Sequence, residues 1–136
     1  LDDPVATANA IDDDGWLHTG DLGNFDDAGR LRIDGRKKDM FIVGGFNAYP
    51  AEIEGFMLKH PAVAQVAVVG VPDERLGQVG KAFVVLTRDA KGAVSEADLM
   101  SWCRERMAGF KAPRYVEFLG ELPLNATGKV MKDQLR

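Results

Sequence analysis

Cysteine is almost absent from this 136-residue sequence, which contains only Cys103. A disulfide within the chain is therefore excluded, and a lone thiol fits the reducing cytoplasm. Long apolar runs are absent too, since no stretch approaches the roughly 20 residues that a membrane span needs. The acidic first residues also lack the charged-then-apolar pattern of a signal peptide. We therefore expect a cytoplasmic protein with no membrane span.

Positive charge is not in excess either. The chain has 17 basic and 21 acidic residues, so nucleic acid is an unfavourable partner. His18 and His60 have no neighbour at a metal-binding spacing, so the sequence predicts no metal site. Charge is nevertheless uneven: residues 1–34 hold nine acids and two bases, whereas residues 104–136 hold four acids and seven bases. Cations beside glycines in the second region suit a phosphate-bearing ligand.

The chain begins with a segment that cannot close a core alone. Residues 1–29 are rich in Asp and Gly and carry turn signals at Asp14-Gly15, Gly20-Asp21 and Ala28-Gly29. We therefore expect this segment to be the tail end of a larger domain that starts upstream, in a truncated chain.

The remaining sequence is regularly patterned. Alternation before and after the turn at residues 35–39 predicts a β-hairpin from Leu31 to Val43. Pro50 suits the first position of a helix that ends before Pro61. The further predicted elements are strands at 63–71 and 82–87, a helix after the Ser95/Asp98 capping box, and a strand at 115–119. This order predicts an α+β fold, with a hairpin followed by a small sheet and helices packed on it.

Three polar, glycine-bearing segments are candidate sites. Residues 15–21 read Gly-Trp-Leu-His-Thr-Gly-Asp, and Asp21 is suited to a ribose diol or simply to capping its own turn. Residues 35–50 combine cations at a turn with Gly44-Gly45, which allow a ligand close to the backbone or belong to a plain surface hairpin. Residues 125–129 read Asn-Ala-Thr-Gly-Lys, and Lys129 on this loop either reaches another domain's site or is merely solvated.

Together and in this order, the three segments resemble the adenylate-forming superfamily of acyl-CoA synthetases, adenylation domains and firefly luciferase. The first resembles its Thr-Gly-Asp motif, residues 35–54 its hinge and glycine loop, and residues 125–129 its catalytic-lysine motif. Residues 110–114, Phe-Lys-Ala-Pro-Arg, are similar to a segment of acyl-CoA synthetases. The resemblance runs from about Asp12 to Arg136.

The resemblance implies the C-terminal part of an ATP-dependent acyl-CoA ligase, which activates a fatty or other hydrophobic acid as acyl-AMP and transfers it to CoA. Residues 1–36 would end the large domain, and residues 37–136 would form the small mobile domain. The family's Ser/Thr/Gly-rich phosphate loop is missing from these residues, so ATP with its Mg²⁺ and the acid would bind mainly upstream, and the fragment alone would be inactive.

By position, the resemblance assigns Asp21 to the ribose hydroxyls and Arg36 to the ribose or phosphate. Lys38 matches the hinge, and Lys129 matches the lysine that bridges the acid and the α-phosphate.

For the second half-reaction, Gly44 and Gly45 would line the tunnel for the pantetheine arm of CoA. Lys111 and Arg114 are candidates for the CoA phosphates.

Three other functions stay open. One is an adenylation domain that loads a carrier protein, although the segment at residues 110–113 favours the CoA-using branch. Luciferase-like oxygenation is a weaker alternative. A stand-alone interaction module without catalysis is the third, and the retained Lys129 argues against it.

Overall fold

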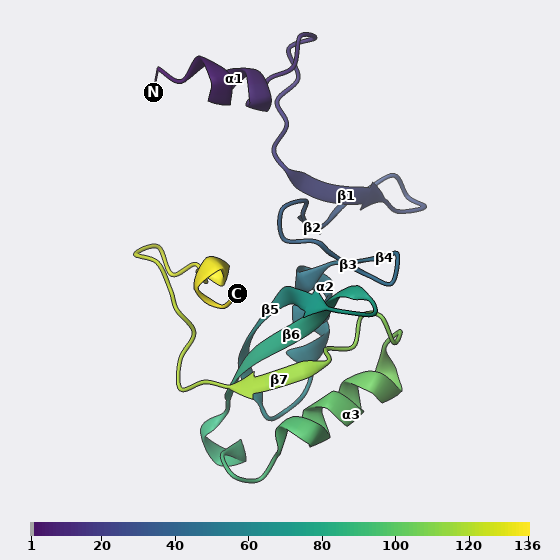
Figure 1. Cartoon of the computed structure of the whole chain (residues 1–136), viewed down its shortest axis with the longest axis vertical. Coiled ribbons are helices and arrows are strands. Elements are labelled where there is room, and N and C mark those ends of the chain that lie inside the picture. The colour runs from purple at the N-terminus through teal and green to yellow at the C-terminus, as the bar shows by residue number, and fades with distance from the viewer. Residues whose placement is uncertain (1) are drawn as a thin grey trace. The chain divides into compact units, whose positions relative to one another are not determined.

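The computed structural model describes residues 2–136, which fall into two compact units (Figure 1). The first runs up to Lys38 and the second is Asp39–Arg136. No helix in the described part of the chain is long and apolar enough to cross a membrane.

The first unit is a helix followed by a two-stranded ribbon. Helix α1 (Pro4–Ala10) starts after Asp3, whose carboxylate accepts the N–H of Ala6 at 2.9 Å. Strands β1 (Asp21–Phe25) and β2 (Leu31–Arg36) pair antiparallel. None of residues 2–38 is buried, and Phe25 on the ribbon is 73% exposed. The prediction that the start of the chain cannot close a core alone is confirmed.

The predicted hairpin from Leu31 to Val43 is wrong. Strand β2 pairs back onto β1, and the next strand, β3 (Phe41–Val43), pairs forward with β4 (Phe46–Ala48). The alternation in both segments is typical of strands, but it does not say which neighbour each strand pairs with. Gly44-Gly45 therefore forms the turn of a hairpin rather than the end of one.

The second unit is built on a five-stranded sheet. Strands β5 (Val63–Asp73) and β6 (Gly77–Leu86) form a long antiparallel hairpin, β3 pairs with the start of β6, and β7 (Tyr115–Phe118) runs parallel to β6. Strand β5 is thus an edge strand. The sequence located all these strands in outline, but β6 begins five residues earlier than predicted, at Gly77.

Two helices cover one face of this sheet, which confirms the α+β class. Helix α2 (Pro50–Met57) begins with a proline, as predicted, and buries Ile53 and Met57. Helix α3 (Glu96–Arg106) begins at the predicted capping box: Ser95 Oγ accepts the Asp98 N–H, and the Asp98 carboxylate accepts the Ser95 N–H. Leu99 and Cys103 of α3 complete the core with inward residues of the strands.

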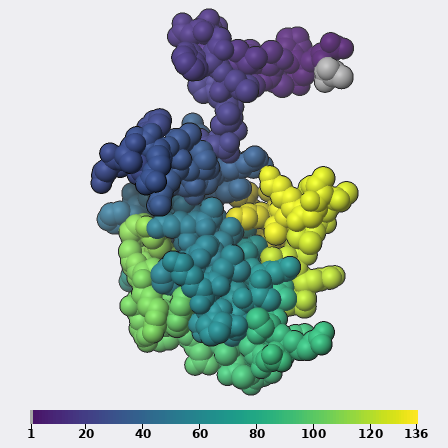
Figure 2. Space-filling view, turned by 180° about the vertical axis from the view of Figure 1, so that it is seen from behind, coloured from purple at the N-terminus to yellow at the C-terminus, as the bar shows by residue number. Residues whose placement is uncertain are grey.

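The C-terminal segment covers the other face of the sheet. Side chains alternate between faces along a strand, so Ala67, Val69 and Phe83 point away from the helices. They form a second cluster with Leu122 and Leu135. Short 3-10 turns occur at η1 (Arg88–Ala90) and η2 (Lys132–Gln134). Figure 2 shows this segment, in yellow, at the surface of the unit.

Candidate functional site

The first unit brings Asp21 and Arg36 together. Asp21 opens β1, Arg36 closes β2, and the two residues are register partners. Arg36 Nε lies 3.3 Å from a carboxylate oxygen of Asp21, and both side chains stay partly exposed. The Asp21 N–H donates to Thr19 Oγ1 at 3.1 Å. The pair therefore presents an acceptor and a cation side by side at the open end of the ribbon, as recognition of a ribose and a phosphate would require.

Asp12 organises the loop before this pair. Its carboxylate accepts the N–H groups of Trp16 and Asp14 and lies 2.9 Å from His18 Nε2. The hydrogen bond from Trp16, with that from His18, holds the pKa of Asp12 below its ordinary value. Trp16 is 73% exposed, so its ring is presented to the outside.

Lys38 lies at the junction of the two units. The boundary falls directly after it, between Lys38 and Asp39. The preceding residue, Lys37, is tied to the first unit, because its N–H donates to the carbonyl of Gly20 at 2.8 Å. Lys38 thus directly follows a hydrogen-bonded residue of the first unit and directly precedes the second unit.

Gly44 and Gly45 form the tight turn between β3 and β4. Their φ values are +55° and +90°, the left-handed pair that a two-residue type I′ hairpin turn requires. The Gly44 N–H donates to the Leu76 carbonyl, and a Cβ on Gly44 would lie 3.2 Å from the Leu76 side chain. A Cβ on Gly45 would meet nothing within 4 Å. The backbone at Gly45 is therefore accessible to a ligand on the side where a Cβ would project.

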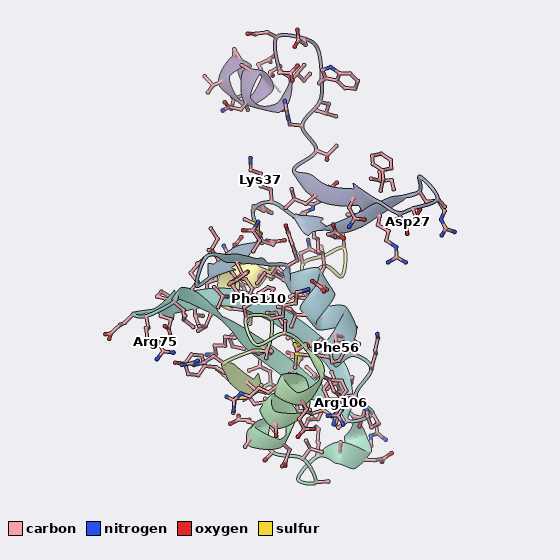
Figure 3. All side chains as sticks on the ribbon, turned by 90° about the vertical axis from the view of Figure 1, so that its right-hand side faces the viewer. Asp27, Lys37, Phe56, Arg75, Arg106 and Phe110 are labelled. Carbon is pink, nitrogen blue, oxygen red and sulfur yellow. The ribbon has the colours of Figure 1, made fainter. Side chains whose placement is uncertain are left out.

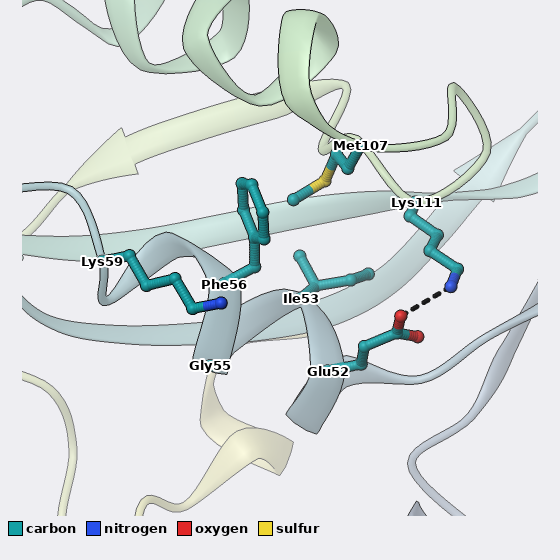
Figure 4. Close-up of a pocket in the computed structure, with 7 residues that line it drawn as sticks. All are labelled: Glu52, Ile53, Gly55, Phe56, Lys59, Met107 and Lys111. Atoms are coloured by element: carbon teal, nitrogen blue, oxygen red, sulfur yellow. Dashed lines mark hydrogen bonds and ion pairs between the residues drawn. The ribbon is translucent and has the colours of Figure 1, made fainter.

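Lys111 borders a pocket of about 250 Å³ between α2 and the segment that follows α3 (Figure 4). Ile53, Phe56 and Met107 supply its apolar wall. Lys111 Nζ lies 2.6 Å from a carboxylate oxygen of Glu52 at one end. An ammonium has three donors, so this ion pair leaves Lys111 able to donate to a second anion.

Arg114 borders a different hollow, of about 400 Å³, together with Arg75, Tyr115 and Asp73. Figure 3 shows Arg75 well apart from Phe56, which belongs to the Lys111 pocket. Hydrogen bonds from the N–H groups of Leu76 and Arg75, aided by the two arginine charges, lower the pKa of Asp73. Lys111 and Arg114 are thus not brought into one pocket, although both stay close to the surface.

Lys129 stands on an ordered turn. Asn125 Oδ1 accepts hydrogen bonds from the Thr127 N–H at 3.0 Å, the Thr127 hydroxyl at 2.8 Å and the Lys129 N–H at 2.8 Å. Main-chain bonds between Asn125 and Lys129, and between Leu124 and Val130, close the turn below it. A lysine on so constrained a backbone is presented outward at a defined place.

Sequence reasoning missed two residues near this turn. The carboxylate of Glu54, on α2, accepts the Val68 N–H at 2.8 Å and lies 2.6 Å from Lys132 Nζ. No local pattern announces a pair 78 residues apart, and the Lys132 partner is evident only in the folded chain.

Other side chains with chemical potential are structural. Cys103 is fully buried, and burial raises the pKa of its thiol to about 11, which disfavours the reactive thiolate. Cys103 thus belongs to the core of the second unit. Within residues 2–136, no three His, Cys, Asp or Glu side chains lie close enough together to hold a metal ion.

Comparison with known proteins identifies the family of this chain. Residues 52–129, more than half of the chain, match the family described as the AMP-binding enzyme C-terminal domain. A CoA ligase of Mycobacterium tuberculosis, named for a methyl-dioxo-octahydro-indenyl propanoyl group, is 58% identical over 100% of this chain and 26% of its own length. The chain thus spans about a quarter of this relative.

Two solved structures share the fold. ATP-bound MatB from Rhodopseudomonas palustris has a TM-score of 0.88 and 41% identity, covering 98% of this chain and 26% of that one. The o-succinylbenzoate CoA synthetase MenE from Bacillus subtilis, in complex with its acyl-adenylate intermediate, has a TM-score of 0.88 and 40% identity, covering 99% and 27%. The chain belongs to the adenylate-forming enzymes and carries their AMP-binding enzyme C-terminal domain.

Proposed function

We propose that this chain is the C-terminal part of an ATP-dependent acyl-CoA ligase. In the first half-reaction the carboxylate of the acid attacks the α-phosphorus of ATP, forming acyl-AMP and releasing pyrophosphate. In the second, the thiol of CoA attacks the acyl carbon and releases AMP. Family membership and the CoA-ligase names of the relatives support this proposal over loading of a carrier protein.

The observation that carries the proposal is the Lys129 turn. Adenylation brings a carboxylate and a phosphate, both anionic, into contact, and charge builds on the phosphoryl oxygens in the transition state. An ammonium between them offsets the repulsion, and it is most effective when its place is fixed beforehand. The three hydrogen bonds to Asn125 Oδ1 fix the backbone that carries Lys129 in this way.

The other residues divide between the two half-reactions. Asp21 would accept from the ribose hydroxyls, while Arg36 would contact the ribose or α-phosphate. Gly44 and Gly45 would leave room for the pantetheine arm, because the outer side of Gly45 is open.

Lys111 and Arg114 would then bind CoA phosphates. Their separate hollows suit a ligand whose 3′-phosphate and diphosphate are themselves separate groups.

The proposal includes a division of labour between domains. Residues 1–36 would complete a large domain that holds ATP with its Mg²⁺ and the acid, and residues 37–136 would move as one body about Lys38. The unit boundary after Lys38 supports this division. The acid would be fatty or otherwise hydrophobic, which is in keeping with the largely hydrocarbon group in the name of the 58% identical relative.

The test compares Lys129→Ala with Lys91→Ala in the full-length enzyme. Lys91 is an exposed lysine on the loop before α3 and serves as the matched control. We expect Lys129→Ala to slow adenylation, measured by pyrophosphate exchange, by about a hundredfold or more. Thioester formation from preformed acyl-adenylate should change far less, and Lys91→Ala should leave both rates unchanged. An equal loss in both half-reactions would contradict the role of Lys129.

A further inference from the structure

The carboxylate of Glu54 lies where three parts of the second unit meet. Glu54 belongs to α2, Val68 to the edge strand β5, and Lys132 to the C-terminal segment. Because β5 has no strand on its outer side, the Val68 N–H points off the sheet, and Glu54 supplies its acceptor at 2.8 Å. Lys132 Nζ reaches the same oxygen at 2.6 Å. The helical layer is thereby linked to the opposite layer around the edge of the sheet.

This contact helps to hold the end of the chain. The Lys132 and Glu54 side chains are each 19% exposed, so both partners are less exposed than those of the other ion pairs described in this unit. Three residues further on, Leu135 enters the apolar cluster with Ala67 and Val69. One polar and one apolar anchor thus fix the chain directly after the Lys129 turn.

The anchor is coupled to the turn through the backbone. Only Val130 and Met131 separate Lys129 from Lys132. The Met131 N–H donates to the Pro123 carbonyl at 2.8 Å, and Leu124 bridges Val130, so the two arms of the turn move together. The hydrogen bonds to Asn125 close the turn, and the Lys132–Glu54 contact ties the chain just after it to α2.

We propose that Glu54 and Lys132 are positioning residues for Lys129, an inference that rests on the proposed function. Neither side chain needs to touch a substrate. Their pair holds the turn so that the Lys129 ammonium arrives between the two anions rather than beside them. A misplacement of about 1 Å can cost about a hundredfold in rate, so a lost anchor should be felt mainly in adenylation.

The experiment uses full-length enzyme carrying Lys132→Met, Glu54→Gln or Lys132→Arg. Methionine keeps most of the length of lysine without its charge, and glutamine keeps an oxygen for the Val68 N–H. Arginine restores the cation. We expect Lys132→Met and Glu54→Gln to slow adenylation roughly ten- to hundredfold, with thioester formation from preformed acyl-adenylate within about twofold of wild type. Lys132→Arg should recover most of the loss.

A second readout is independent of activity. Hydrogen exchange should quicken about tenfold or more at the amides of Met131 and Leu135 in Lys132→Met, while the amides of β6 keep their protection. Lys91→Met is the matched control and should change neither measurement. These results together would support the inference.

Three outcomes would overturn it. An equal loss in both half-reactions with a lowered Tm would make the pair a general stabiliser of the unit. Wild-type adenylation in Lys132→Met, in an enzyme that Lys129→Met inactivates for adenylation, would remove the positioning role and leave the proposed function intact. If Lys129→Met itself adenylates at the wild-type rate, the proposed function fails, and this inference fails with it.

Discussion

Substitutions at Gly45 can separate two effects, backbone strain and steric blocking of a ligand. The strain arises with any side chain, whereas the blocking depends on the size of the side chain. Its φ of +90° lies in the left-handed region, and a Cβ there would meet nothing within 4 Å. Any L-residue other than glycine therefore costs roughly 1–2 kcal/mol in this conformation, with no added clash inside the unit. For a domain of this size, that cost lowers Tm by roughly 4–16 °C. Gly45→Ala and Gly45→Leu should therefore lower the stability of the unit by similar amounts.

Their effects on chemistry should differ widely if the pantetheine arm passes over this turn. Gly45→Ala and Gly45→Leu share the strained backbone, so alanine is the matched control for the larger side chain. We expect both variants to retain adenylation in a pyrophosphate-exchange assay. The rate of thioester formation from preformed acyl-adenylate should be about a hundredfold or more lower in Gly45→Leu than in Gly45→Ala, because leucine would displace the arm.

The measurement to make first is thermal unfolding, since it shows whether the two variants carry equal strain. If their Tm values agree within a few degrees and their thioester rates also agree, nothing passes over Gly45. The glycine pair would then be required only by the type I′ turn.

Three further predictions address the core of the second unit and Lys38, the residue directly before it. Residues 39–136 should fold alone, and Ile53→Ala, which empties a site 1% exposed, should cost about 2–5 kcal/mol. Leu58→Ala, at an exposed position beside the same helix, should cost less than about 1 kcal/mol in the same urea titration; similar costs would mean that Ile53 is not in the core. Cys103 should resist alkylation at pH 8 until the unit unfolds, and stability should fall between pH 9.0 and about 11, where only the unfolded thiol loses its proton; rapid labelling of folded protein would contradict this burial. Lys38→Pro, which fixes φ near −65°, should retain adenylation and lose thioester formation, so that acyl-AMP accumulates; full ligase turnover would place the pivot elsewhere.

Local signals in the sequence were sufficient for helices α2 and α3, whereas α1 was not predicted. The Ser95/Asp98 capping box and Pro50 act within a single turn of chain, so their effect does not depend on the rest of the fold. The β-branched run of β5 likewise predicts a buried strand wherever it is placed. The α+β class followed from the order of these elements.

Strand pairing depended on contacts that are distant in sequence. The start of β6 was missed because Gly77, Gln78 and Gly80 do not look like a strand. Gly80 lies close to Phe41, since a Cβ on it would be 3.3 Å from the ring. A glycine inside a strand often marks such a close approach, but the sequence does not name the approaching residue.

The residues of the candidate site likewise include some with a local sequence signal and some that depend on distant contacts. Asp21 and Arg36 were each singled out from the sequence, but their direct pairing depends on strand β1, which was not predicted. The Asn125 turn has a local signature, since an Asn two residues before Thr can accept from the backbone ahead of it. Glu54 and Lys132 have none, because two elements on opposite faces of a sheet must fold before they meet.

The rigidity of the two turns has a consequence for the proposed mechanism. Gly44-Gly45 closes a hairpin tied to Leu76, and the Lys129 turn is closed by Asn125 and anchored by Lys132. Neither is built as a loose loop that swings alone into a site. If both act on one adenylate, in adenylation and then in thioester formation, the second unit must carry them there as a body. Motion would then concentrate in the backbone near Lys38, where the two units join, as in other hinged domain closures.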